Sequence, residues 1–301
     1  MLFLHESRRA AALAQGPYRY WQDLQETASS WLDHEGPRLA ASLSLYSLLS
    51  LAPLVILTIA MAALVFGRSE AQQALVDQVR QVMGGDGART VQTVIEHGKE
   101  PHAGGVASVI GIIILIVGAS SVFGELQSAL NKIWDVKPLP NAGLLTLIKS
   151  RLWSFALVLG FGFLLLVSLL FSTALAAFGH FFSAHLSLPT ALLVVANVVV
   201  SFAGIFVLIA LILRYVPDVR LRWRDVWPGA LATAVLFTIG KALLGLYLGK
   251  TAVGSPYGAA GSMVVVILWV YYSAMIFYFG AEFTRVRARR AAQRRRPVEG
   301  Y

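Results

Sequence analysis

Residues 152–179 read LWSFALVLGFGFLLLVSLLFSTALAAFG, an unbroken run without Asp, Glu, Lys, Arg or His. An α-helix rises about 1.5 Å per residue, so about 20 apolar residues cross the hydrocarbon core of a bilayer, and this run is long enough alone. Soluble domains carry about a quarter charged residues. This chain of 301 residues has 14% charged and 57% hydrophobic residues, with a mean hydropathy of +0.67. The composition argues against a soluble enzyme, a disordered protein and a secreted disulfide scaffold, and it favours a membrane protein.

Five further apolar stretches lie on either side of this run, so the sequence predicts an all-α integral membrane protein with six transmembrane helices. One membrane domain, 1–301, would hold the predicted spans, which are about 39–67, 103–128, 152–179, 186–213, 226–249 and 260–284. The fifth span is interrupted by Lys241, and the alternative is five spans with 226–249 as an interfacial helix. Residues 1–30 carry several charges and no uninterrupted apolar run, so we expect no signal peptide.

The distribution of Lys and Arg predicts the orientation of the chain. With both termini on one side, 19 of the 25 cations lie on that side, five lie on the other, and Lys241 lies within the fifth span. The positive-inside rule therefore places the N and C termini in the cytoplasm. Six of the seven tryptophans fall at the same predicted interface: Trp21, Trp31, Trp134, Trp153, Trp223 and Trp227.

Three segments outside the spans carry patterns of their own. Residues 17–35 space their apolar side chains as an amphipathic helix that lies on the inner leaflet. Residues 69–97 predict two short outer helices separated by Gly84-Gly85-Asp86-Gly87. The basic cytoplasmic tail 285–301 resembles a nucleic-acid arm, but it begins next to a membrane helix, where each cation gains about 1 kcal/mol from anionic lipid. We therefore expect the bilayer and its anionic phospholipids as partners, and no nucleic acid.

Ionisable residues near the centre of a bilayer cost about 2.5–3.5 kcal/mol, so they usually face protein or water. Three of them fall within predicted spans: Glu125, Lys241 and Glu282. Helical spacing puts further polar residues on the same faces. The predicted substrate-binding residues are Glu125, Lys241, Glu282, Tyr46, Tyr271, Tyr278, Ser121 and Arg214. All of them except Lys241 belong to the cytoplasmic halves of their helices, which predicts an inward-facing polar cavity.

The same residues can also be explained without a substrate, by solvation, ion pairing or packing between helices. Both carboxylates lie near helix ends and could be solvated, or paired with Lys132, Arg285 or Arg214. Serine commonly joins membrane helices, and tyrosine commonly anchors them at the interface. Lys241 could extend outward, or meet an anionic group of a substrate.

No motif for catalysis or metal binding is convincing. Cysteine is absent, and neither HExxH nor GxSxG occurs. The run 245–251 is one residue short of a phosphate loop and closes a membrane helix. His97, His102, His180 and His185 would face one compartment, but their spacing does not favour a metal site. We expect no enzyme activity, no catalytic residue, no metal and no cofactor.

Two GxxxG motifs, at Gly245/Gly249 and Gly254/Gly258, permit close contact between helices and therefore a homo-oligomer.

Four stretches of the chain are similar to motifs of one known family. They are LAASLSLYSLLSLAPL (39–54), SSVFGELQSALNKIWDV (120–136), RYVPDVRLRWRDVWPGAL (214–231) and YGAAGSMVVVILWVYYSAMIFYFGAEFTRV (257–286). Together they resemble the YihY/BrkB family of bacterial inner-membrane proteins over about residues 17–290. The resemblance implies a multi-pass protein of the inner membrane with six helices and both ends cytoplasmic. The family has carried the label ribonuclease BN, but this chain has no nuclease constellation.

Members of the family have been linked to serum resistance, a virulence trait, and to movement of lipid or envelope precursors. No functional residue can be carried over, because the family has no agreed substrate or catalytic set. We expect a transporter, exporter or flippase for an anionic or amphipathic envelope metabolite or lipid. The alternatives are a non-transporting membrane scaffold for envelope assembly or virulence and, third, a ribonuclease.

Overall fold

The described part of the chain is helical throughout its regular structure. The computed structural model describes residues 21–97, 105–136, 190–250 and 261–295. A helix over residues 21–33 comes first. It is followed by α2 (Gly36–Leu49), α3 (Leu51–Phe66), α4 (Arg68–His97), α5 (Gly105–Ile133), α7 (Thr190–Tyr215), α8 (Trp223–Lys250) and α9 (Gly261–Arg295). The predicted third span, 152–179, and the GxxxG pair at Gly254/Gly258 lie outside the described residues.

Two helices of the described part are long and apolar enough to cross a membrane by themselves. They are Trp223–Leu244 within α8 and Gly261–Gln293 within α9. A third candidate combines α2 with the first part of α3, and its two halves are bent by 59°. The all-helical, membrane-embedded class is confirmed at this level, whereas the number of six spans stays a prediction.

The predicted first span is thus two helices, and the break lies at Ser50. Proline has no amide hydrogen, so Pro53 deprives the carbonyl of Leu49 of its usual helical partner. The amide of Ser50 still donates to the carbonyl of Tyr46, at 2.9 Å, which closes α2. On the neighbouring helix, a Cβ at Gly118 would lie 2.7 Å from the Pro53 ring, so α5 passes very close to the break.

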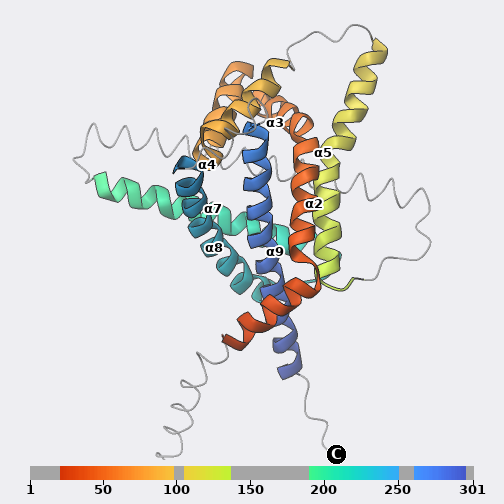
Figure 1. The fold of residues 1–301 in the computed structure, drawn as a ribbon, viewed down its shortest axis with the longest axis vertical. Coiled ribbons are helices and arrows are strands. Elements are labelled where there is room, and N and C mark those ends of the chain that lie inside the picture. The colour runs from red at the N-terminus through yellow and green to blue at the C-terminus, as the bar shows by residue number, and fades with distance from the viewer. Residues whose placement is uncertain (1–20, 98–104, 137–189, 251–260, 296–301) are drawn as a thin grey trace, which may run out of the picture.

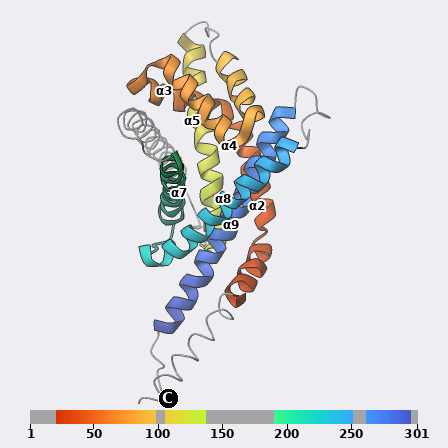
Figure 2. The ribbon, with the colours of Figure 1, turned by 90° about the vertical axis from the view of Figure 1, so that its left-hand side faces the viewer.

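The two halves of this broken helix belong to different hydrophobic cores. The first, which we call the main core, joins α2 with α5, α7, α8 and α9 through Ala40, Leu130, Leu213, Ala230 and Tyr278, among others. The second, which we call the α3–α4 core, joins Val55, Ile59 and Ala62 of α3 with Ala71, Val91 and Ile95 of α4. Figure 2 shows α3 and α4 together at one end of the bundle, beside the first part of α5. The break at Ser50 therefore separates residues of the two cores, while α4 also contacts α9 and α3 also contacts α5.

Helices α8 and α9 interlock through small residues. Gly229 of α8 lies under Thr284 of α9, and Gly280 of α9 lies under Thr233 of α8, so that a Cβ at either glycine would meet a threonine hydroxyl at 1.7 Å. Each threonine donates to the glycine carbonyl four residues earlier in its own helix, at 2.7 and 2.8 Å. Small residues let membrane helices approach closely, and here the pairing is reciprocal.

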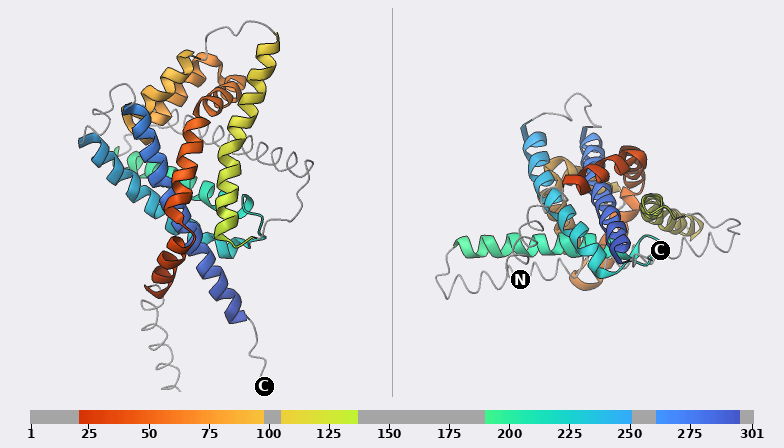
Figure 3. Two further views of the ribbon diagram at one scale, coloured as in Figure 1. Left: turned by 45° about the vertical axis from the view of Figure 1, so that its right-hand side comes forward. Right: turned by 90° about the horizontal axis from the view of Figure 1, so that it is seen from below.

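Three other helices agree in part with the segments that the sequence predicted. Helix 21–33 falls within the predicted amphipathic segment. Helix α4 contains one non-helical residue, Gly84 with φ 79°, so it is two helices separated where the glycines predicted. The last helix continues to Arg295, so the first residues of the predicted tail are helical. Helix α7 crosses the direction of α9 instead of running along it, as the view from below shows (Figure 3).

Candidate functional site

Three distant segments meet where α9 leaves the bundle. They are the turn between helix 21–33 and α2, the turn that ends α5, and the last turns of α9. Together they supply five charged or titratable side chains: His34, Asp135, Glu282, Arg285 and Arg289. We call this group the ionic cluster.

Glu282 is the buried centre of the ionic cluster, with none of its surface exposed. Its Oε1 lies 2.5 Å from Nδ1 of His34, and its Oε2 accepts a hydrogen bond from Nη1 of Arg285 at 3.2 Å. Arg285 is only 4% exposed. Nη1 of Arg285 also lies 3.3 Å from the same Nδ1 of His34, so the three side chains meet at one point.

Asp135 extends the ionic cluster to the end of α5. Its Oδ2 accepts from Arg285 and, at 2.7 Å, from Arg289, while its Oδ1 lies 3.5 Å from Nε2 of His34. Partial burial of Asp135 opposes ionisation, but the charge and hydrogen bond of Arg285 outweigh it, so the pKa of the Asp135 carboxyl lies below its usual range. Two carboxylates thus face two guanidinium groups, and the cluster is balanced in charge when His34 is neutral.

Two carboxylates of this region, those of Asp135 and Glu35, lie on residues with a left-handed backbone conformation at helix ends. Asp135 has φ 51°, and α5 ends there in a Schellman motif, in which the amide of Val136 donates to the carbonyl of Asn131 and that of Asp135 to the carbonyl of Lys132. Glu35 has φ 57° and ends helix 21–33 in the same left-handed conformation. Glycine usually occupies this position, and among the described residues these are the two non-glycine residues with positive φ.

A second ring of polar contacts surrounds the ionic cluster. Glu35 pairs with Lys132 of α5 at 2.5 Å and with Arg38 at 2.9 Å, and these hydrogen bonds hold the pKa of its carboxyl below the usual range. Arg290 of α9 pairs with Asp23 and Glu26 of helix 21–33.

Asp218, in the loop between α7 and α8, accepts from Asn131 of α5 at 2.7 Å. Contacts of this kind fasten helix 21–33, α5, α9 and that loop to one another. The arrangement therefore cross-links four segments at this end of the bundle.

Of the predicted site residues, Glu282, Tyr278 and Glu125 lie nearest to this region. Tyr278 is fully buried in the main core, and its hydroxyl has no hydrogen-bond partner. Glu125 is half-buried on α5, close enough for its charge to act on Tyr278. It forms no ion pair with any described residue. Glu282 is paired with Arg285, which was one of the alternatives left open by the sequence.

Lys241 lies apart from these residues. It sits between α8 and α9 against Phe237, Trp269, Tyr272 and Ser273, in a gap that leaves no room for a water molecule. Gly240 next to it touches Ile276 and Tyr272 closely enough that a Cβ would clash. The structure therefore does not bring Lys241 into one cavity with Glu125 and Glu282.

The other four predicted residues have separate surroundings. Tyr46 is 40% exposed on α2, and Tyr271 packs against the main core. Ser121 donates to the carbonyl of Val117 in its own helix at 2.7 Å. Arg214 donates to the carbonyl of Leu221 and lies over the rings of Tyr215 and Trp223, so it closes the loop between α7 and α8.

Sequence reasoning missed His34, Asp135 and Arg289 as members of a site. The sequence assigns Arg289 to the basic tail, and it gives His34 and Asp135 no role. One signal was available, because Glu282, Arg285 and Arg289 follow one another at helical spacing and therefore share a face of a continued sixth helix. The partners from the two turns carry no such pattern.

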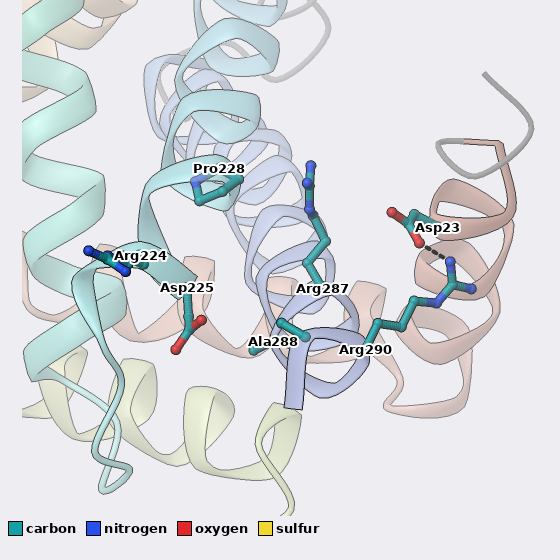
Figure 4. A pocket seen from close by; sticks show the side chains of 8 residues that line it. Asp23, Arg224, Asp225, Pro228, Arg287, Ala288 and Arg290 are labelled. Atoms are coloured by element: carbon teal, nitrogen blue, oxygen red, sulfur yellow. Dashed lines mark hydrogen bonds and ion pairs between the residues drawn. The ribbon is translucent and has the colours of Figure 1, made fainter. Parts of the chain in front are cut away.

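A charged cavity lies beside the ionic cluster, between the start of α8, the end of α9 and helix 21–33. Its volume is about 350 Å³, and Figure 4 shows its lining side chains. Arg224 and Asp225 come from the first turn of α8, Arg287 and Arg290 come from α9, and Asp23 comes from helix 21–33. Within the described residues, no group of His, Asp and Glu is placed to hold a metal ion.

Comparison with known proteins places the chain in a family of membrane proteins. The profile of the family described as Virulence factor BrkB matches residues 27–299. A "UPF0761 membrane protein" of Verminephrobacter eiseniae is 31% identical over 58% of this chain and 40% of its own length, and one of Delftia acidovorans is 30% identical over the same shares. The chain thus aligns with less than half of these two relatives.

The ribonuclease-like protein YfkH of Bacillus subtilis is 26% identical over 89% of this chain and 95% of its own length. No solved structure matches. The resemblance noted in the sequence is therefore confirmed at the level of the family.

Proposed function

Because the chain belongs to the Virulence factor BrkB family of membrane proteins, we propose that it moves an anionic or amphipathic compound of the envelope, such as a lipid, across the bacterial inner membrane. Both termini are proposed to lie in the cytoplasm, as the Lys and Arg distribution predicts. No catalytic group is assigned, and we propose no ribonuclease activity.

One observation carries the proposal: the broken helix between two cores. Helix α2 packs with the main core and α3 with the α3–α4 core, so a change of angle at Ser50 would move one unit against the other. Broken membrane helices recur at the substrate sites of transporters, where the freed backbone groups line a path. The close contact between Gly118 and Pro53 supports this assignment, because it holds α3 against α5 next to the point where the angle would change.

The ionic cluster supplies the second element of the mechanism, a latch. Glu282 and Arg285 are buried and paired, and a buried pair is costly to break by removing one partner. Opening this end of the bundle requires that the contacts of α9 with His34 and Asp135 separate together. A transported compound that offered its own negative charge would compensate for part of that loss.

Flux in liposomes tests the proposal. The full chain is reconstituted in vesicles that carry a fluorescent phosphatidylglycerol in both leaflets, and an external reductant that cannot cross the membrane is added. Vesicles without protein lose only the signal of the outer leaflet, whereas a translocating protein exposes the inner leaflet as well. Gly118→Val should strongly reduce this exposure, because the added side chain meets Pro53 and blocks the hinge.

Gly85→Ala is the matched control, because a Cβ at Gly85 meets nothing within 4 Å. Equal flux in wild type, Gly118→Val and empty vesicles would refute transport of this lipid. A separate variant, Glu125→Ala combined with Lys241→Ala, tests the roles of those residues. Unchanged flux in that double variant would remove both from the substrate path and leave the hinge intact.

A non-transporting membrane scaffold is the second candidate, and one feature favours it. Glu282 is fully paired, and Lys241 lies in a gap without room for water, as expected if the polar residues only pack helix on helix. A protein that is folded and fully incorporated in vesicles, yet moves neither lipid nor soluble anions, would support the scaffold.

A further inference from the structure

We propose that the charged cavity beside the ionic cluster binds the phosphate group of an anionic phospholipid, with the acyl chains lying along α8. This site goes beyond the transport proposal, since a lipid can bind there whether or not the protein moves it. The cavity of about 350 Å³ has room for a phosphate and its glycerol.

The charges of the cavity favour an anion. Three guanidinium groups line it, from Arg224, Arg287 and Arg290, against the carboxylates of Asp23 and Asp225. Asp23 and Arg290 pair with each other, and Arg290 also pairs with Glu26, so an anion would meet chiefly Arg224 and Arg287. Arg224 is exposed and forms no ion pair with any described residue, and the same holds for Arg220 and Arg222 just before it. The cavity therefore offers Arg224 and Arg287 against Asp225, and Arg220 and Arg222 add positive charge to the chain just before α8.

Exposed tryptophans place this cavity at the level of lipid headgroups. Trp223 and Trp227 flank Arg224 and Asp225 on α8 and are 41% and 56% exposed, and Trp21 on helix 21–33 is 61% exposed. Tryptophan is enriched at the interface between membrane and water, where its ring is apolar and its N–H is polar. An anion that bound from solution would use the arginines but would have no need of the exposed tryptophans around them.

An apolar stripe continues from the cavity along α8. Its members are exposed by between 42% and 57% and recur every four residues, so they form one ridge that winds along the helix. They are Trp227, Leu231, Val235, Ile239 and Leu243. Helix α8 is long and apolar enough to cross a membrane over Trp223–Leu244. A phospholipid with its phosphate in the cavity would have this stripe beside its acyl chains.

Quenching of tryptophan fluorescence by brominated lipids measures the binding. The full chain is reconstituted with mixtures of phosphatidylcholine and phosphatidylglycerol, one of the two brominated, which gives the relative affinity for the anionic lipid. A cation near the membrane surface contributes about 1 kcal/mol, equivalent to about a fivefold preference. The wild type should prefer phosphatidylglycerol, and Arg224→Gln with Arg287→Gln should lower that preference by about fivefold or more.

The matched control is Arg80→Gln with Arg89→Gln, which removes the same charge from exposed positions on α4. It should leave the preference unchanged. Asp225→Asn should raise the preference, which keeps the test decisive if the arginine variant folds poorly. An equal loss in the α4 control, no preference in the wild type, or displacement of the lipid by millimolar glycerol 3-phosphate would overturn the assignment. These measurements require no flux, so they are independent of the transport test.

Discussion

The two ends of the bundle are held by different forces. At the end where α9 finishes, ion pairs join residues far apart in the chain, such as His34 with Glu282 and Arg290 with Asp23. At the α3–α4 end, the inner contacts are apolar, and the ion pairs of α4 are local, Arg80 with Asp77 and Arg89 with Asp86, both on exposed side chains. The same types of residue thus have different roles at the two ends, because burial and chain separation differ.

This difference predicts where charge matters. A pair on the surface of a helix is screened by water and contributes about 0–1 kcal/mol, whereas breaking a buried pair by removing one partner costs about 3–5 kcal/mol. The end with the ionic cluster can therefore respond to a charged ligand or to pH, and the α3–α4 end responds mainly to packing.

The largest effect is expected for Arg285→Met. The substitution leaves the buried carboxylate of Glu282 without its guanidinium partner, so it should destabilise the protein by about 3–5 kcal/mol. Thermal unfolding in detergent measures the change. Adding Glu282→Leu should restore much of the stability, because the uncompensated charge is then gone. No rescue by the second substitution would contradict the pairing.

The next largest effect is expected at the contact between α8 and α9. Gly280→Ala places a methyl group against Thr233, which should cost about 1–3 kcal/mol by overpacking. Thr233→Ala on the same chain should relieve the overlap and recover part of the loss. A similar cost for Gly85→Ala, which has free space around it, would show that the contact is not the cause.

A smaller effect depends on pH. The lowered pKa of Asp135 stabilises the folded chain at pH values above the ordinary carboxyl range, and this contribution disappears as the pH falls through the lowered value. Since Asp135 is half-exposed, water screens the pair, and we expect less than about 1 kcal/mol. Asp135→Asn should therefore flatten the fall in melting temperature below about pH 4. An unchanged acid profile would contradict this role of Asp135.

The smallest effect is expected for Arg89→Gln on α4. Its pair with Asp86 lies on the surface, and its loss should change the stability by no more than about 0.5 kcal/mol. The variant is therefore a reference for Arg285→Met, measured in the same unfolding experiment. If both variants lost the same stability, the contrast between the two ends would be wrong.

Much of the candidate site could not be predicted from one sequence. Glu282 stood out as an acid in an apolar helix, and Arg285 was recognised as a possible partner. His34 and Asp135 did not stand out, because loop residues carry no periodicity that relates them to α9. Lys241 stood out for the same reason as Glu282, yet it lies in a different environment, since helical spacing gives the face of a residue and not its depth or its neighbours.

The sequence alone determined that this is a helical membrane protein of a known family and that α4 is divided at Gly84. These properties follow from composition, from the period of the helix and from residues whose backbone chemistry acts locally. The tertiary structure decided which charges are paired, which half of the broken helix joins which core, and which arginines border a cavity. Those features depend on contacts between segments as far as 267 residues apart, and long-range packing is not encoded in any local pattern.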